Sequence, residues 1–359
     1  MTSKLRHDKS RLRVLLLPPN QWRPSWDMYS PGNAPNPTRI FEILAGRGID
    51  VELIDPNGWP WNPFAGQHSL FEGLDPSRAL RVLTLARNCD LVLACFEAAA
   101  VPLLLLRQLF GFAAPIAIID IGLTDTWWIR ERILDFVIPR VDAIFVLGSN
   151  QIEYIRNRWK TSANLEFFHQ HVDTEFYEPA SAVDGHILTV GEDRGRDFAT
   201  FMGAIEGLDA PVLVKSKRVA ADQTRFPNVR VVSSHLSGLE YRQLFADSRF
   251  VVVPLTSSVH ASGVGTVLEA LAMGKPLIVS DSPGIRDYVV SGETALTVPC
   301  SDASAMRNAM ARLLSEPDTC ARLAANGRRF VQENCSHAVH AGKLFDAIHR
   351  VIARFDCRS

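Results

Sequence analysis

Residues 262–284 read SGVGTVLEALAMGKPLIVSDSPG, which combines a glycine turn, a helical pattern and an apolar strand. Glycines at the start of a helix let the backbone approach a ligand closely, and the free N–H groups of the first turn suit a phosphate. One turn later, Glu269 can accept two hydroxyl hydrogen bonds, as a carboxylate does from a ribose diol, although an isolated acid is also typical of a cap or a solvated position. The predicted phosphate cradle consists of Ser262, Gly263, Val264, Gly265 and Thr266.

The same alternation of strand and helix extends along the chain in both directions from this segment. Short apolar runs separated by amphipathic stretches lie at 13–18, 50–55, 90–95, 115–120 and 142–148, and a second series begins at 186. This is the rhythm of parallel βαβ units. The runs lack polar alternation, as expected for strands in sheets that helices cover on both faces. The predicted fold class is therefore α/β.

The length of the chain, 359 residues, exceeds what one compact core accommodates, so we expect two domains. The Pro, Ala, Ser, Asp and Gly residues of 179–185 are typical of a linker. We predict an N-terminal domain at 1–178 and a C-terminal domain at 186–335. A final helix at 336–359 is expected to pack back on the N-terminal domain.

The charge, the cysteines and the apolar stretches of the chain indicate which partners and which location to expect. The formal net charge is −1 and basic residues form no long blocks, so we expect no nucleic-acid partner. The six cysteines lack metal-ligand spacing and are interpreted as reduced cytosolic thiols. Residues 91–109 are broken by Glu97, Pro102 and Arg107, which argues against a membrane span. We expect a cytoplasmic location; for the basic start of the chain, a solvated tail and a peripheral contact at the inner membrane face both stay open.

One resemblance covers much of the chain. Residues 251–299, VVVPLTSSVHASGVGTVLEALAMGKPLIVSDSPGIRDYVVSGETALTVP, resemble the donor-nucleotide signature of GT-B-fold glycosyltransferases, particularly the retaining family 4, also called group 1. HILTVGEDRGRDFATFMGAI at 186–205 and FFHQHVDTEFYEP at 167–179 resemble the segments that precede that signature. The resemblance is dense over 142–315 and only topological over 1–120. It implies two Rossmann-like α/β/α domains that face each other across a cleft, the first for the acceptor and the second for a nucleotide sugar.

Roles for individual donor-site residues follow from this resemblance. Glu269 matches the glutamate that binds the donor ribose, and Gly263 to Thr266 match the loop whose amides hold the diphosphate. Arg196 matches a phosphate-neutralising lysine and is expected to act in catalysis, with Arg194 as a helper and Lys217 as a weaker candidate; solvated loop positions are the alternative for these cations. His171 stands where the family has glycine and is interpreted either as a neutral cleft-lining residue or as a satisfied core histidine.

The resemblance also implies roles in the first domain. Gly32 and Asn33 lie in the loop that approaches the acceptor in the family. Asp120 lies near the position of the family's catalytic histidine and is expected either to touch the transferred sugar or to cap the next helix.

Two departures from the family pattern concern the chemistry itself. The first of the family's two glutamates would fall near Ala261 or Ser262, where no acid is present, and Glu192 replaces an arginine of the pattern. The first glutamate handles the transferred sugar in the family. Its absence puts the identity of the sugar and the catalytic competence of the chain in question.

The expected function is transfer of a hexose from a nucleotide-diphosphate sugar to a glycan, lipid-linked or small-molecule acceptor, with retention, in polysaccharide biosynthesis. We expect no cofactor besides the nucleotide-sugar co-substrate, and no metal, because the second domain lacks a plausible Asp-x-Asp site. Two alternatives stay open: a nucleotide-sugar 2-epimerase on the same fold, and a degenerate, non-catalytic partner subunit that binds nucleotide or glycan.

Overall fold

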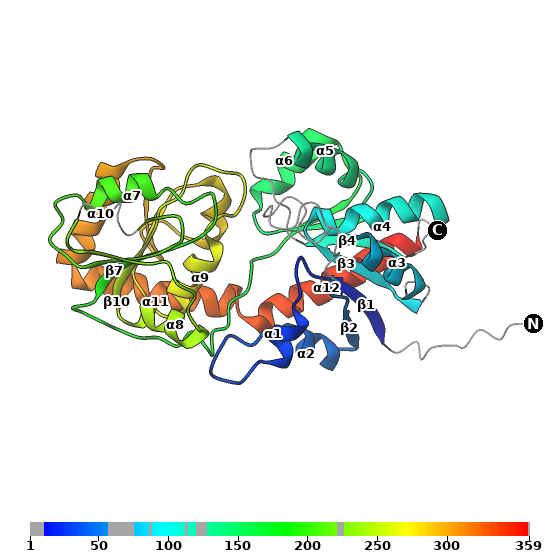
Figure 1. Ribbon diagram of the computed structural model, residues 1–359, viewed down its shortest axis with the longest axis horizontal. Coiled ribbons are helices and arrows are strands. Elements are labelled where there is room, and N and C mark those ends of the chain that lie inside the picture. The colour runs from blue at the N-terminus through cyan, green and yellow to red at the C-terminus, as the bar shows by residue number, and fades with distance from the viewer. Residues whose placement is uncertain are drawn as a thin grey trace, which may run out of the picture. The chain divides into compact units, whose positions relative to one another are not determined.

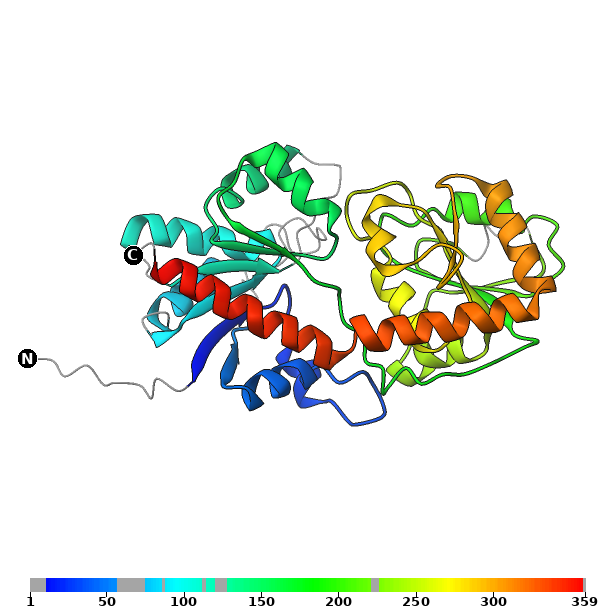
Figure 2. The ribbon, with the colours of Figure 1, turned by 180° about the vertical axis from the view of Figure 1, so that it is seen from behind.

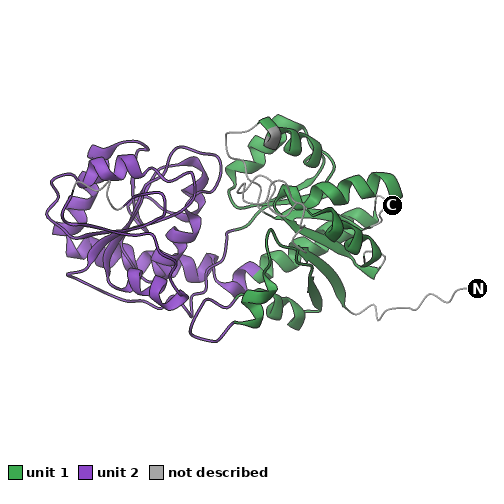
Figure 3. Cartoon of the chain, in the orientation of Figure 1, with its two compact units in different colours: residues 1–28, 37–168, 341–359 green, residues 29–36, 169–340 purple. Residues whose placement is uncertain are grey.

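The computed structural model describes residues 11–56, 75–85, 88–111, 114–119, 128–220 and 226–357. The chain divides into two compact units (Figure 3). Unit 1 takes in residues 1–28, 37–168 and 341–359, and unit 2 takes in residues 29–36 and 169–340.

Unit 1 is built on a six-stranded parallel sheet with the order β2-β1-β3-β4-β5-β6 (Figure 1). Its strands are β1 (Leu12–Leu17), β2 (Ile49–Leu53), β3 (Leu91–Cys95), β4 (Ile116–Ile119), β5 (Ala143–Val146) and β6 (Asn164–Phe167). Its helices are α1 (Arg23–Asp27), α2 (Arg39–Gly46), α3 (Pro76–Leu85), α4 (Glu97–Phe110), α5 (Trp128–Val137), α6 (Asn150–Trp159) and most of α12 (His337–Asp356).

Unit 2 repeats this plan with the strand order β12-β11-β10-β7-β8-β9, again all parallel. Its strands are β7 (His186–Val190), β8 (Val212–Lys215), β9 (Val229–Val232), β10 (Ser248–Val253), β11 (Leu277–Ser280) and β12 (Leu296–Val298). Its helices are α7 (Phe198–Ile205), α8 (Gly238–Ala246), α9 (Val264–Ala272), the 3-10 helix η3 (Pro283–Tyr288), α10 (Ala303–Ser315) and α11 (Pro317–Asn334). The predicted α/β fold class is confirmed.

The apolar strands of unit 2 are covered on both faces, as their sequences indicate. Phe250 and Val252 of β10 lie in the core cluster that also contains α7 and α10 residues, and both are fully buried. Because side chains alternate along a strand, Val251 and Val253 face the other way. α9 packs against β10, and α11 packs against α9. None of the described helices has both the length and the apolar character needed to cross a membrane.

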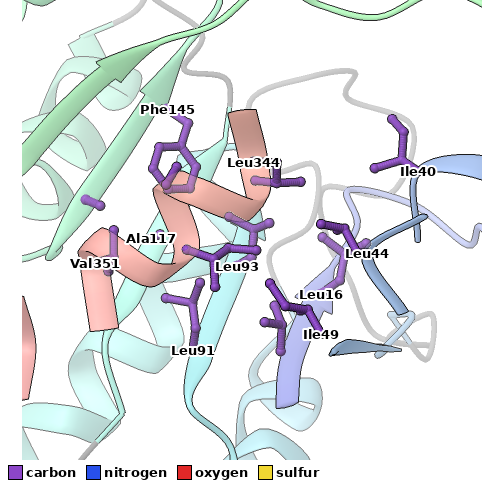
Figure 4. Close-up of a cluster of buried hydrophobic side chains, with 14 of the residues drawn as sticks. Leu16, Ile40, Leu44, Ile49, Leu91, Leu93, Ala117, Phe145, Leu344 and Val351 are labelled. Atoms are coloured by element: carbon purple, nitrogen blue, oxygen red, sulfur yellow. The ribbon is translucent and has the colours of Figure 1, made fainter. Parts of the chain in front are cut away.

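The C-terminal helix contributes to the core of unit 1. Leu344 and Val351 of α12 lie among Leu91, Leu93 and Phe145, and all five are nearly or fully buried (Figure 4). Figure 2 shows α12, in red, lying along the sheet of this unit. Its apolar stripe therefore completes one face of the unit 1 sheet.

The division into units differs from the predicted domain limits at three places, and at the C-terminal end residues 336–340 group with unit 2. Residues 169–178 group with unit 2, ten residues before the predicted linker, and so does the short segment 29–36. The amide of Asn36 donates to Oδ2 of Asp173 at 2.7 Å, which ties that segment to residues at the start of unit 2. Such a tie joins residues 137 positions apart, so no local pattern predicts it.

Candidate functional site

The candidate site lies at the carboxyl ends of β7 and β10 in unit 2. From β7 the chain moves outward through β8 and β9 and then returns to β10 on the other side of β7. In open parallel sheets, ligands bind outside the carboxyl ends of the strands at such a reversal of strand order. The loops that follow these two strands, 191–197 and 254–263, are therefore where a ligand is expected.

Backbone hydrogen bonds join these two loops. The amide of Asp197 donates to the carbonyl of Pro254 at 3.1 Å, and the amide of Thr256 donates to the carbonyl of Gly195 at 2.9 Å. Arg196 and Leu255 form an isolated antiparallel bridge. The two loops thus hold a common backbone framework for the side chains that they carry.

Arg196 is the buried cation of this framework, with 5% of its surface exposed. Its Nε donates to Oδ2 of Asp193 at 2.7 Å, and its Nη2 donates to Oγ1 of Thr266 at 2.8 Å. Its Nη1 is buried and has no hydrogen-bond partner within the described part of the chain. A buried donor without a partner is costly, so this nitrogen is available to an anionic ligand.

Two glycines make room for this guanidinium. A Cβ at Gly191 would collide with Nε of Arg196, and a Cβ at Gly263 would lie 3.4 Å from its Cζ. The glycines of the VG and GVG segments thus allow close packing of the backbone around a buried charge.

The first turn of α9 lies beside Arg196, since Thr266 belongs to that turn. Gly263 is the N-cap of the helix with φ of +79°, and its carbonyl accepts the first helical hydrogen bond from Val267 at 3.0 Å. The amides of residues 264–266 come before that bond in the chain. Like the first amides of every helix, they have no carbonyl acceptor within the helix. A Cβ at Gly265 would meet no atom within 4 Å, so the space over this turn is open.

Glu269 lies one turn further along α9 and is partly buried. Tyr177 donates its hydroxyl to Oε1 at 3.1 Å, and Tyr241 donates its hydroxyl to Oε2 at 2.9 Å. Burial raises the pKa of Glu269 to about 7, and the two tyrosine hydrogen bonds and the charge of Arg196 only partly oppose this rise. The carboxyl group is therefore close to its titration midpoint at neutral pH.

The sequence pattern indicates neither tyrosine, nor Asp193 as the partner of Arg196. Tyr177 lies 92 residues before Glu269, and Tyr241 lies 28 residues before it. Asp193 had a local signal, because it lies only three residues before Arg196, close enough for the two side chains to pair within one turn. The tyrosines had no such signal.

The other predicted cations are arranged differently. Arg194 and Lys217 are exposed, and the backbone amide of Lys217 donates to Oε2 of Glu192 at 2.9 Å. Nζ of the buried Lys215 lies 3.5 Å from Oε1 of Glu192. Glu192, which stands where the sequence pattern of the family has an arginine, thus pairs with Lys215.

His171 packs with two histidines at the start of α12. Its ring centroid lies 5.2 Å from that of His337 and 4.8 Å from that of His340. Burial, together with these two rings, holds the pKa of His171 well below its ordinary value, so the ring is neutral. Within the described ranges, no three His, Cys, Asp or Glu side chains form a group suited to a metal ion.

The predicted acceptor residues Gly32 and Asn33 lie in the segment that groups with unit 2. This segment passes against the start of α8, where a Cβ at Gly238 would lie 2.7 Å from the carbonyl oxygen of Asn33. Gly32 is exposed and has φ of +82°, which favours glycine. The predicted catalytic Asp120 lies outside the described residues.

Comparison with known proteins shows which family one part of the chain matches. Residues 223–330 match the family model described as glycosyl transferases group 1. The chain is 31% identical over 228 residues to the lipopolysaccharide core biosynthesis mannosyltransferase LpcC of Rhizobium leguminosarum bv. viciae, a match that covers 55% of this chain and 62% of that protein. It is 31% identical over 180 residues to the putative glycosyltransferase EpsD of Bacillus subtilis, which covers 44% of this chain and 47% of that protein. Each match thus spans less than two thirds of the relative.

Solved structures resemble the whole fold. Sucrose-phosphate synthase from Thermosynechococcus elongatus superposes with a TM-score of 0.73 at 19% identity, over 95% of this chain and 100% of that one. Anabaena HepE in complex with UDP and glucose superposes with a TM-score of 0.68 at 12% identity, over 95% and 100% of the two chains. At these identities the likeness concerns the fold alone. Residues 223–330 thus match a group 1 glycosyl transferase domain, and the chain has the GT-B fold.

Proposed function

We propose that this protein is a glycosyltransferase of family 4 that moves a hexose, with retention, from a nucleotide-diphosphate sugar to a glycan or lipid-linked acceptor. The two curated relatives named above are a lipopolysaccharide core mannosyltransferase and a putative glycosyltransferase, which supports this reaction class and does not favour the epimerase alternative. With a lipid-linked acceptor, the enzyme would work at the cytoplasmic face of the membrane as a peripheral protein.

The observation that carries the proposal is the free Nη1 of Arg196 beside the first turn of α9. Arg196 is 5% exposed, and Asp193 and Thr266 occupy only its Nε and Nη2. A phosphate oxygen accepts from a guanidinium and from helix N-terminal amides at once. The two donor sets share Thr266, whose hydroxyl accepts from Arg196 and whose amide belongs to the open turn.

In this mechanism the chain mainly stabilises the leaving group. Negative charge builds on the nucleoside diphosphate as its bond to the sugar breaks. The amides of residues 264–266 and the guanidinium of Arg196 meet that charge in fixed positions, and such preorganised donors stabilise a transition state strongly. Glu269 holds the ribose in this proposal. We expect the chemistry to need no divalent metal.

A direct test is nucleotide binding to the protein and to one variant that leaves the fold intact. We expect one of UDP, GDP and ADP, or its sugar, to raise the unfolding temperature in a thermal-shift screen. In Gly265→Ala the new methyl group enters the open space over the first turn of α9, so affinity for that nucleotide should fall about tenfold or more. The unfolding temperature without nucleotide should not fall, because alanine favours a helix over glycine.

Gly46→Ala is the matched control. A Cβ at Gly46 would likewise meet no atom within 4 Å. Gly46 also lies in a helix, but in α2 of unit 1. It should leave nucleotide affinity unchanged. Equal affinities in wild type and Gly265→Ala would contradict the placement of the diphosphate. Nucleotide binding with neither transfer nor donor hydrolysis would instead identify the non-catalytic partner subunit.

A further inference from the structure

The carboxylate of Glu269 is held by side chains from two other elements of unit 2. Glu269 belongs to α9, Tyr241 to α8, and Tyr177 to the segment that precedes β7. Each carboxylate oxygen accepts one phenol hydroxyl, at 3.1 Å from Tyr177 and at 2.9 Å from Tyr241. Two bonds to the two oxygens fix the plane of the carboxylate as well as its position.

Both phenols are themselves fixed by packing. Phe245 of α8 contacts both rings, with centroids 6.5 Å from Tyr177 and 5.4 Å from Tyr241. Nη1 of Arg328 donates to the carbonyl of Tyr177 at 3.0 Å, and Nη1 of Arg242 donates to the carbonyl of Phe176 at 2.8 Å. The backbone that carries Tyr177 is thus tied to α11 and to α8, so the phenol has little freedom to turn away from Glu269.

These bonds leave the carboxylate able to bind a ligand. An ionised carboxylate offers about four lone-pair sites, and the tyrosines use two of them. A vicinal diol presents two hydroxyl donors, which match the remaining capacity. A protonated carboxyl group loses part of that capacity and becomes a donor at one oxygen. Recognition of a diol therefore depends on the ionised form of Glu269.

Three charged or titratable groups act on this carboxylate. Tyr177 and Tyr241 donate to it, and Arg196, from the loop after β7, favours its charge from a longer distance. Arg328 of α11 donates instead to backbone carbonyls, that of Tyr177 at 3.0 Å and that of Ala272 at 2.6 Å. Burial raises the pKa of both phenols, so neither tyrosine ionises near neutral pH. Glu269 is thus the member of this group that changes its charge near neutral pH.

We propose that Tyr177 and Tyr241 are positioning residues that hold Glu269 ionised and oriented for the ribose diol of the donor, so that nucleotide binding is lost as Glu269 takes up a proton. The proposal rests on the function proposed above. Donor affinity then depends on pH through one carboxylate. The two tyrosines set the pH at the midpoint of this dependence.

The experiment compares Tyr177→Phe and Tyr241→Phe with wild type from pH 5.5 to pH 9, using the tightest binder among UDP, GDP and ADP. Loss of a hydroxyl donor disfavours the charged carboxylate, so the midpoint of the binding curve should move to higher pH by about one unit in each variant. At pH 7 affinity should fall several-fold, and KM for the donor sugar should rise more than kcat falls. At pH 9 affinity should return close to that of wild type.

Tyr154→Phe, which removes an exposed hydroxyl from α6 in unit 1, should match wild type throughout.

A carbon-13 NMR titration of glutamate side chains in the nucleotide-free protein, with Glu269→Gln to assign the signal, tests the tyrosines separately. If no nucleoside diphosphate binds to wild type, the proposed function fails, whereas the titration still reports whether each tyrosine variant raises the midpoint of Glu269. Midpoints that stay unchanged in both variants would overturn the positioning role. So would an affinity loss that is equal at every pH, because that pattern marks a merely structural defect.

Discussion

Burial and hydrogen bonding act on Glu269 in opposite directions, and burial dominates. Its pKa is about 7, against an ordinary value of 4.5. The folded protein therefore keeps a proton at this residue that the unfolded chain has already released between these two pH values. By proton linkage, the free energy of unfolding falls as pH rises from 4.5 through 7, and the ionised carboxylate is a local cost to stability above that range.

We therefore predict that Glu269→Gln is more stable than wild type at pH 8, by about 1–3 kcal/mol. The glutamine oxygen can accept from one tyrosine, and its NH₂ group can donate to the phenol oxygen of the other after that hydroxyl turns. The advantage should vanish near pH 4.5. Urea unfolding at pH 4.5 and pH 8 measures it, with Glu175→Gln as an exposed control. A wild type that is the more stable of the two at pH 8 would count against the buried ionised state.

At the scale of residues, the sequence predicted those site members that a local turn brings together. Arg196 and Glu269 each follow a glycine turn. In the structure Arg196 contacts Thr266 in the first turn of α9, and Glu269 lies one turn further along the same helix. Tyr177 and Tyr241 meet Glu269 only after three elements have packed, so no spacing along the chain indicated them. Whether these residues act as proposed stays a prediction.

At the scale of elements, α9 depends on how it begins. Gly263 has φ of +79°, a left-handed conformation that costs other residues about 1–2 kcal/mol. A Cβ there would also lie 3.0 Å from Cδ2 of Leu255 and 3.1 Å from Cγ1 of Val253. The glycine thus meets two separate requirements, one of backbone conformation and one of space.

Gly263→Ala should consequently lower the free energy of unfolding by about 2–4 kcal/mol, from backbone strain and crowding together. Gly292→Ala separates the two effects, because Gly292 has φ of +76° but a Cβ there would meet no atom within 4 Å. That variant should lose only the conformational part, about 1–2 kcal/mol. Chemical denaturation of both proteins provides the comparison. Equal losses would mean that β10 yields to the added methyl group without cost.

The βα pattern itself was predictable because it is local: apolar runs without polar alternation indicate parallel strands covered on both faces. The assignment of segment 29–36 to unit 2 was not predictable. It depends on the contact of Asn33 with Gly238 and on the hydrogen bond from Asn36 to Asp173. Both join residues far apart in the sequence, and the acceptor role predicted for Gly32 and Asn33 therefore concerns a segment attached to unit 2.

At the scale of the whole molecule, each unit has its own buried core. The cluster around Leu93 and Phe145 lies in unit 1, and the cluster around Phe201 and Phe250 lies in unit 2. All seven tryptophans, from Trp22 to Trp159, fall within the sequence ranges of unit 1. Tryptophan fluorescence therefore reports on unit 1 alone, whereas the candidate nucleotide site lies in unit 2.

A ligand that binds one folded unit stabilises that unit by mass action, by about 2.7 kcal/mol at a hundred times its Kd. The nucleoside diphosphate found in the screen, at a hundred times its Kd, should thus raise the calorimetric unfolding temperature of unit 2 by about 5–11 °C and leave the fluorescence-detected transition of unit 1 in place. With Gly265→Ala at the same nucleotide concentration, the calorimetric shift should shrink as well. If the fluorescence transition moves in step with the calorimetric one, the two cores unfold as a single cooperative body, and nucleotide binding in unit 2 stabilises unit 1 too.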